Sequence, residues 1–155
     1  MARSWRGQRA LGAAPHGHWK TTTFVAGLAA DGVRAPFVID RAMNADIFRA
    51  YVEKVLAPEL RPGDIVIMDN LSSHKAPGVA EAIQARGAEP RYLPPYSPDL
   101  NPIEQFFSKL KAILRRVGAR TLNALWRSIG DALNRLTLEE AKAFIKNAGY
   151  RFRSA

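Results

Sequence analysis

The sequence predicts a single α/β domain whose last third is helical. Short runs rich in β-branched and apolar residues alternate with helical patterns over the first two thirds of the chain. After a proline-rich stretch around residue 98, helical periodicity continues to the C-terminus. A length of 155 residues suits one compact domain. We therefore expect one core over residues 19–155, preceded by a basic arm or loop over residues 1–18.

In the first half of the chain, β-branched runs flank one helical pattern. The turn signals Asp31-Gly32 and Pro62-Gly63 separate the runs. Asn44 is expected to cap the helix that follows it. The predicted elements are a hairpin of strands at 21–28 and 35–39, a helix at 45–56 and a buried strand at 64–68.

The second half contains one stiff loop between a short βα region and three helices. The loop PPYSPDLNP has four prolines in nine residues, which restrict its backbone. Apolar residues recur at helical spacing on both sides of it, and Trp126 lies on one such stripe, where we expect it in the core. The predicted elements are a helix at 77–85, a strand at 90–93 and helices at 103–117, 121–136 and 138–147.

The composition excludes several classes of protein. The chain has no cysteine, which rules out disulfides, thiolate zinc sites and cysteine nucleophiles. No apolar run reaches the roughly 18 residues of a membrane span. The basic N-terminus has no apolar stretch after it and does not have the pattern of a signal peptide. We expect a cytoplasmic protein with no membrane partner.

The charge is strongly positive and unevenly distributed. The net charge is +9, and residues 105–155 hold eleven basic side chains against three acidic ones. Residues 1–20 add four basic residues and no acid, whereas residues 21–104 are slightly acidic. A basic flank beside an acidic centre suits a protein that binds a phosphate backbone and gathers carboxylates around a metal ion. A basic protein without a nucleic-acid partner would have the same net charge.

Two acidic residues stand out by their positions. Asp69 follows the strand at 64–68, and α/β sheets place ligands at the carboxyl ends of strands. Glu104 begins the helix after the proline-rich loop, with 34 residues between the two acids. Each has a purely structural interpretation as well. Asp69 could start a turn, and Glu104 could complete a capping box in which Asn101 is the N-cap and Pro102 the first helical residue.

Two blocks of sequence resemble one family. IVIMDNLSSHKAPGV (65–79) and RYLPPYSPDLNPIEQFFSKLK (91–111) closely resemble the DDE superfamily transposases and endonucleases of bacterial insertion sequences related to the mariner superfamily. In that family a DN…H segment follows the central strand, SPDLNPIE precedes the helix with the last acid, and 34 residues separate the two acids. The opening PHGHWKTTTFVAGL resembles the strand that follows the first catalytic Asp. The resemblance extends over nearly the whole chain.

The resemblance implies a ribonuclease H-like fold and an Asp/Asp/Glu triad. Asp69 matches the second Asp and Glu104 the Glu, as catalytic residues and metal ligands. The family's first Asp lies on a strand that would precede Met1, and neither Asp31 nor Asp40 occupies its position. The implied cofactor is Mg²⁺, with Mn²⁺ as a substitute, because two hard cations can activate a nucleophile and stabilise the leaving oxygen of a phosphodiester. We therefore expect an N-terminally truncated catalytic core, without the family's N-terminal DNA-binding region.

Further residues are candidates around this site. Asn70 and His74 belong to the family's DN…H segment and are expected at the rim, although a loop histidine that bonds nearby backbone is an equal alternative. Basic residues on the helix after Glu104 are candidate DNA contacts, and a solvated charged face is the alternative. They are Lys109, Lys111, Arg115 and Arg116.

Three functions remain open at this level. The first is a transposase fragment that cleaves and transfers DNA strands at transposon ends, inactive alone unless an upstream fragment supplies the first Asp. The second is a non-catalytic DNA-binding or dimerising remnant that regulates a full-length transposase. The third is another nuclease of the same fold, which the SPDLNPIE block disfavours. The expected partners are transposon-end and target DNA, with either a second copy or the complementing fragment, at the bacterial nucleoid.

Overall fold

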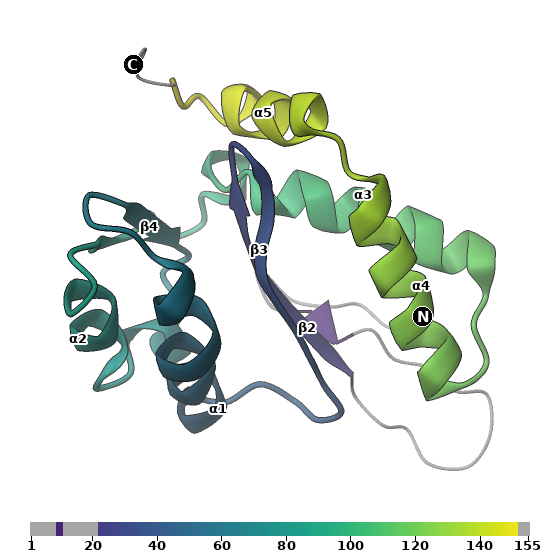
Figure 1. Ribbon diagram of the computed structural model, residues 1–155, viewed down its shortest axis with the longest axis horizontal. Coiled ribbons are helices and arrows are strands. Elements are labelled where there is room, and N and C mark those ends of the chain that lie inside the picture. The colour runs from purple at the N-terminus through teal and green to yellow at the C-terminus, as the bar shows by residue number, and fades with distance from the viewer. Residues whose placement is uncertain (1–8, 11–21, 152–155) are drawn as a thin grey trace.

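The strands form two separate sheets in the part of the chain that the structure describes (Figure 1). The structure is a computed structural model that describes residues 9–10 and 22–151. One sheet is antiparallel and has the order β1-β2-β3; the other is a parallel pair, β4-β5. The strands are β1 (Arg9–Ala10), β2 (Thr23–Ala29), β3 (Gly32–Ile39), β4 (Ile65–Met68) and β5 (Glu89–Tyr92).

The helices begin and end largely where local sequence signals place them. The side chain of Asn44 caps the first helix by accepting from the Ile47 N–H at 2.8 Å, and Thr121 and Thr137 cap the last two. None of these helices is long and apolar enough to cross a membrane, within the described residues. The helices are α1 (Ala45–Tyr51), α2 (Val79–Gln84), α3 (Ile103–Val117), α4 (Leu122–Arg135) and α5 (Leu138–Asn147).

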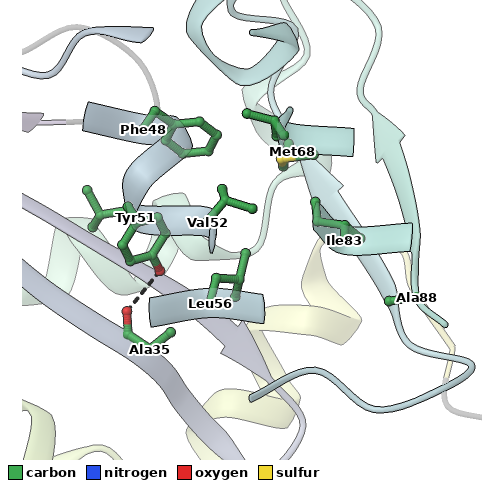
Figure 2. Packing of buried hydrophobic residues seen from close by; sticks show 10 residues of the cluster. Ala35, Phe48, Tyr51, Val52, Leu56, Met68, Ile83 and Ala88 are labelled. Atoms are coloured by element: carbon green, nitrogen blue, oxygen red, sulfur yellow. Dashed lines mark hydrogen bonds between the residues drawn. The ribbon is translucent and has the colours of Figure 1, made fainter. Parts of the chain in front are cut away.

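The hairpin β2–β3 lies between two layers of helices (Figure 1). Successive residues of a strand face opposite sides of the sheet. Val25 therefore packs into a buried cluster with α1, α2 and β4, which includes Phe48, Tyr51 and Met68 (Figure 2). Phe24 packs on the other side against α3 and α4, where its ring meets Phe107 edge to face. The sheet is thereby buried on both faces, as in an α/β core.

Most of the predicted elements are confirmed to within about two residues, and α5 has the predicted bounds. The helix predicted at 45–56 differs, because α1 ends at Tyr51 and continues as a π-turn over Val52–Leu56 and a 3₁₀ turn over Ala57–Glu59. Pro58 explains the change: it has no N–H to donate, and its ring would clash with the carbonyl four residues earlier. The proline-rich loop contains a 3₁₀ turn, Pro98–Leu100.

Two other predictions concern side chains and the N-terminal arm. Trp126 is 41% exposed and so does not lie in the core; α4 buries Ile129 and Ala132 instead. Arg9–Ala10, expected in a loop, form β1 and pair with Thr23 and Phe24. The rest of the predicted arm over residues 1–18 lies outside the described residues.

Candidate active site

Asp69 lies at the carboxyl end of β4. The Met68 carbonyl just before it accepts the Leu93 N–H at 2.8 Å, which is the last bond of the β4–β5 ladder. The chain then leaves the sheet, and the half-buried Asp69 lines a cavity rather than turning into solvent. The predicted strand-end position of this carboxylate is therefore observed.

The proline-rich loop brings a second polar residue onto Asp69. Asn101 is 8% exposed, and its Nδ2 donates to Asp69 Oδ1 at 2.7 Å, across 32 positions of sequence. From the other side of the loop, the Tyr150 hydroxyl donates to the Leu100 carbonyl at 2.6 Å. The end of the loop is thus held at both sides.

Glu104 lies in the first turn of α3, next to the same asparagine. Its N–H donates to the Asn101 carbonyl at 3.1 Å. An acidic residue in this turn interacts favourably with the positive end of the helix dipole. The capping-box alternative is wrong, because the helix starts after Pro102 without a side-chain cap, and the Asn101 side chain points to Asp69 instead. Asn101 therefore bonds to both predicted acids, a role that was not predicted from the sequence.

His74 supports Asp69 from the backbone side. It lies in a 3₁₀ turn, Ser72–Lys75, is 5% exposed, and packs its ring 4.4 Å from the Phe48 ring. Its Nδ1 lies 3.0 Å from the Asp69 carbonyl, which can only accept, so this nitrogen carries the proton. Burial lowers the pKa of His74, and the contact with Asp69 only partly opposes this effect. The ring is thus a neutral structural support, which is the backbone-bonding alternative for this histidine.

Asn70 follows Asp69 and is half-buried. Its Oδ1 is buried, and no donor to it is found among the described residues. A buried acceptor without a partner is unusual in a folded protein and is compatible with a bound cation. No group of three or more His, Asp or Glu side chains placed to hold a metal ion occurs in the described part of the chain.

The four candidate DNA contacts on α3 differ in their surroundings. Lys109 forms an ion pair with Glu140 of α5, and Lys111 is half-buried. Arg115 and Arg116 are exposed in the last turn of the helix. They are eleven and twelve residues from Glu104, which corresponds to roughly 16–18 Å along the helix axis.

A cavity of about 290 Å³ separates β2 from β4. Val25–Leu28 of β2 and Ile65–Met68 of β4 line it, and so do Asp69 and Asn101. On β4 the carbonyls of Asp64 and Met68 bond to β5, so the backbone groups of Ile65 and Ile67 point away from β5. The cavity is thus lined by the edge of β4 that faces away from β5 and by the part of β2 beyond Thr23 and Phe24, the two residues that pair with β1.

Solved structures of Mos1 complexes are similar to this chain. The structure is similar to a Mos1 strand transfer complex, with 19% identity, a TM-score of 0.66, and coverage of 99% of this chain and 50% of that chain. A Mos1 paired-end complex with left transposon end and a Mos1 mariner paired-end complex with Mn give TM-scores of 0.49 and 0.44, at 21% and 20% identity. These cover 97% and 91% of this chain and 51% and 48% of those chains.

The chain therefore has the ribonuclease H-like fold of these transposases and spans about half the length of the solved chains. No curated protein matches it significantly. A model of the family described as DDE superfamily endonuclease matches residues 1–125, which are most of the chain. The chain belongs to the DDE superfamily endonucleases.

Proposed function

We propose that this chain is the catalytic core of a transposase, in which Asp69 and Glu104 hold divalent metal ions for DNA strand cleavage and transfer at transposon ends. The observation that carries this proposal is the pair of bonds that Asn101 makes, one to the Asp69 carboxylate and one to the first turn of α3. Through Asn101 they link two acids that have 34 residues between them in the sequence.

The oxygen donors suit Mg²⁺ or Mn²⁺. Asp69 uses one carboxylate bond for Asn101, and a carboxylate has about four acceptor sites, so directions remain for a cation. The Asn70 Oδ1, which has no donor among the described residues, adds a neutral oxygen beside it. Hard oxygen ligands of this kind are those that Mg²⁺ prefers. When bound, such ions would activate a nucleophile and neutralise charge on the phosphodiester.

We infer that the third carboxylate comes from a separate strand. Residues 1–30 contain no acidic residue, and Asp69 lines the cavity between β2 and β4. A strand in this cavity would pair with β4 and with the part of β2 that β1 leaves unpaired, and could place a carboxylate beside Asp69. An upstream transposase fragment is the partner that suits this role. A chain without it would be catalytically inactive.

DNA is the proposed macromolecular partner. The eleven basic side chains after Glu104 and the similarity to a Mos1 strand transfer complex support this proposal. The proposed phosphate contacts are the exposed Arg115 and Arg116, with Lys109 and Lys111 closer along α3 to Glu104. A second copy of the chain is a further proposed partner, and the bacterial nucleoid is the proposed location.

A regulatory remnant is the second candidate function. The observation that favours it is the lack of a three-residue metal cluster within the described residues. Such a protein would bind DNA or a full-length transposase without cutting.

Metal binding tests the first proposal directly. We would titrate the chain with Mn²⁺ and compare the affinities of Asp69→Asn and Glu104→Gln with that of the wild type. The control is Asp99→Asn, which changes an exposed acid in the proline-rich loop. Weaker binding in the first two variants alone is expected. Equal binding in all four proteins would rule out this metal site.

A further inference from the structure

Asn101 connects the two candidate acids through different parts of the residue. Its side-chain Nδ2 donates to Asp69 Oδ1 at 2.7 Å, and its carbonyl accepts the Glu104 N–H at 3.1 Å. We propose that Asn101 is a positioning residue that fixes the Asp69 carboxylate relative to the first turn of α3, and so sets the arrangement of oxygen donors around a divalent cation. This inference rests on the function proposed above for Asp69 and Glu104.

The backbone of Asn101 is restrained on both sides. Pro102 follows it, and a residue before proline is confined to extended conformations; Asn101 has φ −108° and ψ 101°. Before it, the 3₁₀ turn Pro98–Leu100 closes with the Asn101 N–H donating to the Pro98 carbonyl at 3.1 Å. An extended residue between a turn and a helix directs its side chain to β4 while its carbonyl faces the helix start. The turn and Pro102 thus restrain the backbone from which the amide extends, and packing brings Asp69 within reach of it.

The chemistry of the contact allows one orientation of the amide. A carboxylate only accepts hydrogen bonds, so the NH₂ group of Asn101 must face Asp69. Asn101 is 8% exposed, so rotation away would leave a buried donor without a partner. The contact restrains one carboxylate oxygen and leaves the other acceptor directions of Asp69 for a ligand. Residues that orient a metal ligand in this way influence affinity without touching the metal.

The Mn²⁺ affinity of the full chain, without DNA, tests this role. Asn101→Ala removes the donor, and Asn101→Leu removes it while keeping the side-chain volume. We expect each to weaken Mn²⁺ binding by about tenfold, the lower end of the range for residues that orient metal ligands. Tyr150→Phe is the matched control, because it removes the other anchor of this loop but does not contact Asp69. It should leave Mn²⁺ affinity unchanged even if it lowers thermal stability.

The Asp69→Asn background separates the possible outcomes. There, Asn101→Ala should cause no further loss, because the carboxylate it orients has been removed. If Asp69→Asn and Glu104→Gln lose affinity but neither Asn101 variant does, the role of Asn101 is wrong and the metal site stands. If the wild-type chain binds no Mn²⁺, or binds it independently of both acids, both proposals fail. If circular dichroism shows both Asn101 variants unfolded, Asn101 serves folding and not positioning.

Discussion

Asp69 is held from its backbone and its side chain by different residues. Asn101 bonds to the carboxylate, and His74 bonds to the carbonyl from a position against Phe48. The Tyr92 hydroxyl in turn donates to the His74 carbonyl at 3.1 Å, which ties the turn to β5. A candidate metal ligand is therefore fixed by buried, neutral groups, and these are the groups through which single substitutions should act.

Substitution of His74 tests this support. His74→Phe keeps a ring against Phe48 but removes the donor to the Asp69 carbonyl. Leaving a buried acceptor without its partner should lower the free energy of unfolding by about 1–3 kcal/mol. Urea unfolding measures the change, and Ser72→Ala, at an exposed position of the same turn, should have little effect. Equal stability of His74→Phe and the wild type would show that this contact is not important.

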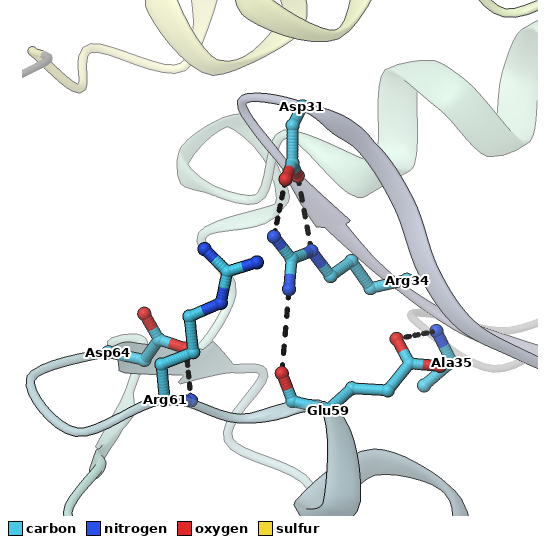
Figure 3. A network of polar contacts seen from close by, with 6 residues as sticks. All are labelled: Asp31, Arg34, Ala35, Glu59, Arg61 and Asp64. Carbon is cyan, nitrogen blue, oxygen red and sulfur yellow. Dashed lines mark hydrogen bonds and ion pairs between the residues drawn. The ribbon is translucent and has the colours of Figure 1, made fainter.

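At the scale of elements, a bulge in the hairpin is braced by the end of α1 and the helical segment that follows it. The β2–β3 register shifts between Val25 and Gly27, opposite Ala35, whose φ of 48° is rare for a residue other than glycine. The Glu59 carboxylate accepts the Ala35 N–H at 2.9 Å, and the Tyr51 hydroxyl donates to the Ala35 carbonyl at 2.8 Å (Figures 2 and 3). Arg34 adds bonds to Asp31 and to the Glu59 carbonyl, and its guanidinium lowers the pKa of Asp31.

Removal of Glu59 should therefore destabilise the hairpin. Glu59→Ala leaves the Ala35 N–H without its acceptor, and we expect a loss of roughly 1–3 kcal/mol in the free energy of unfolding. Glu53→Ala, an exposed acid in the same helical segment, is the control and should change stability by less than about 0.5 kcal/mol. Chemical denaturation of both variants measures the free energy of unfolding. An equal loss in Glu59→Ala and Glu53→Ala would show that the Glu59–Ala35 bond does not stabilise the protein.

The basic end of α3 gives a second prediction at this scale. Lys111→Ala with Arg115→Ala should weaken binding to duplex DNA and flatten its salt dependence, by up to about 0.9 in the log–log slope for each phosphate that is no longer neutralised. Fluorescence anisotropy at several salt concentrations measures this. Arg86→Ala removes an exposed charge two residues after α2, a helix on the other side of the hairpin β2–β3 from α4 (Figure 1), and should have little effect. If the double variant binds with the wild-type affinity and slope, this face is only solvated.

The ion pair between Lys109 and Glu140 allows a test in which DNA affinity is expected to rise. Glu140→Gln keeps the capping box of α5, because glutamine can also accept at that position, but frees Lys109. DNA affinity should rise more than in Glu139→Gln, which changes the net charge equally without releasing a lysine. Anisotropy at low salt distinguishes the two, and an identical rise would mean that only net charge matters.

At the scale of the whole molecule, the cavity between the two sheets has the largest consequences. It is lined by an edge of β4 that has no partner strand among the described residues and by the part of β2 that β1 leaves unpaired, and Ile65 and Ile67 on β4 are 53% and 37% exposed. Strand edges with apolar side chains favour association with other chains. The candidate metal ligand Asp69 and the strand edge most prone to association with other chains therefore line the same cavity.

We predict that residues 1–155 alone aggregate readily and do not cut DNA with Mg²⁺. Fusing a β-strand with a central Asp to the N-terminus should restore solubility and some nicking of a transposon-end duplex. The same strand with Asn in place of Asp should restore solubility only, because it fills the cavity without the third carboxylate. Robust cleavage by residues 1–155 that disappears in Asp69→Ala would contradict this prediction.

Local sequence specifies the elements of this protein and the positions of the two acids along them. Helical periodicity, Asn44 and Thr137 as caps, and the prolines around residue 98 are properties of neighbouring residues, so they predict structure without knowledge of the fold. The π-turn after α1 was not predicted, although Pro58 is a local signal for it. Most of the α/β architecture follows from these local rules.

The contacts of the polar side chains, in contrast, depend on tertiary packing. The sequence around Asn101 is that of a helix N-cap, but the Asn101 side chain bonds to Asp69. The Glu59 carboxylate accepts a hydrogen bond from the Ala35 N–H. Lys109, a candidate DNA contact from its position in the sequence, forms an ion pair with Glu140. Each contact joins residues 24 to 32 positions apart, so it depends on how the elements pack. A polar side chain bonds to whichever group the packing of the elements brings within about 3 Å, and local sequence does not specify that group.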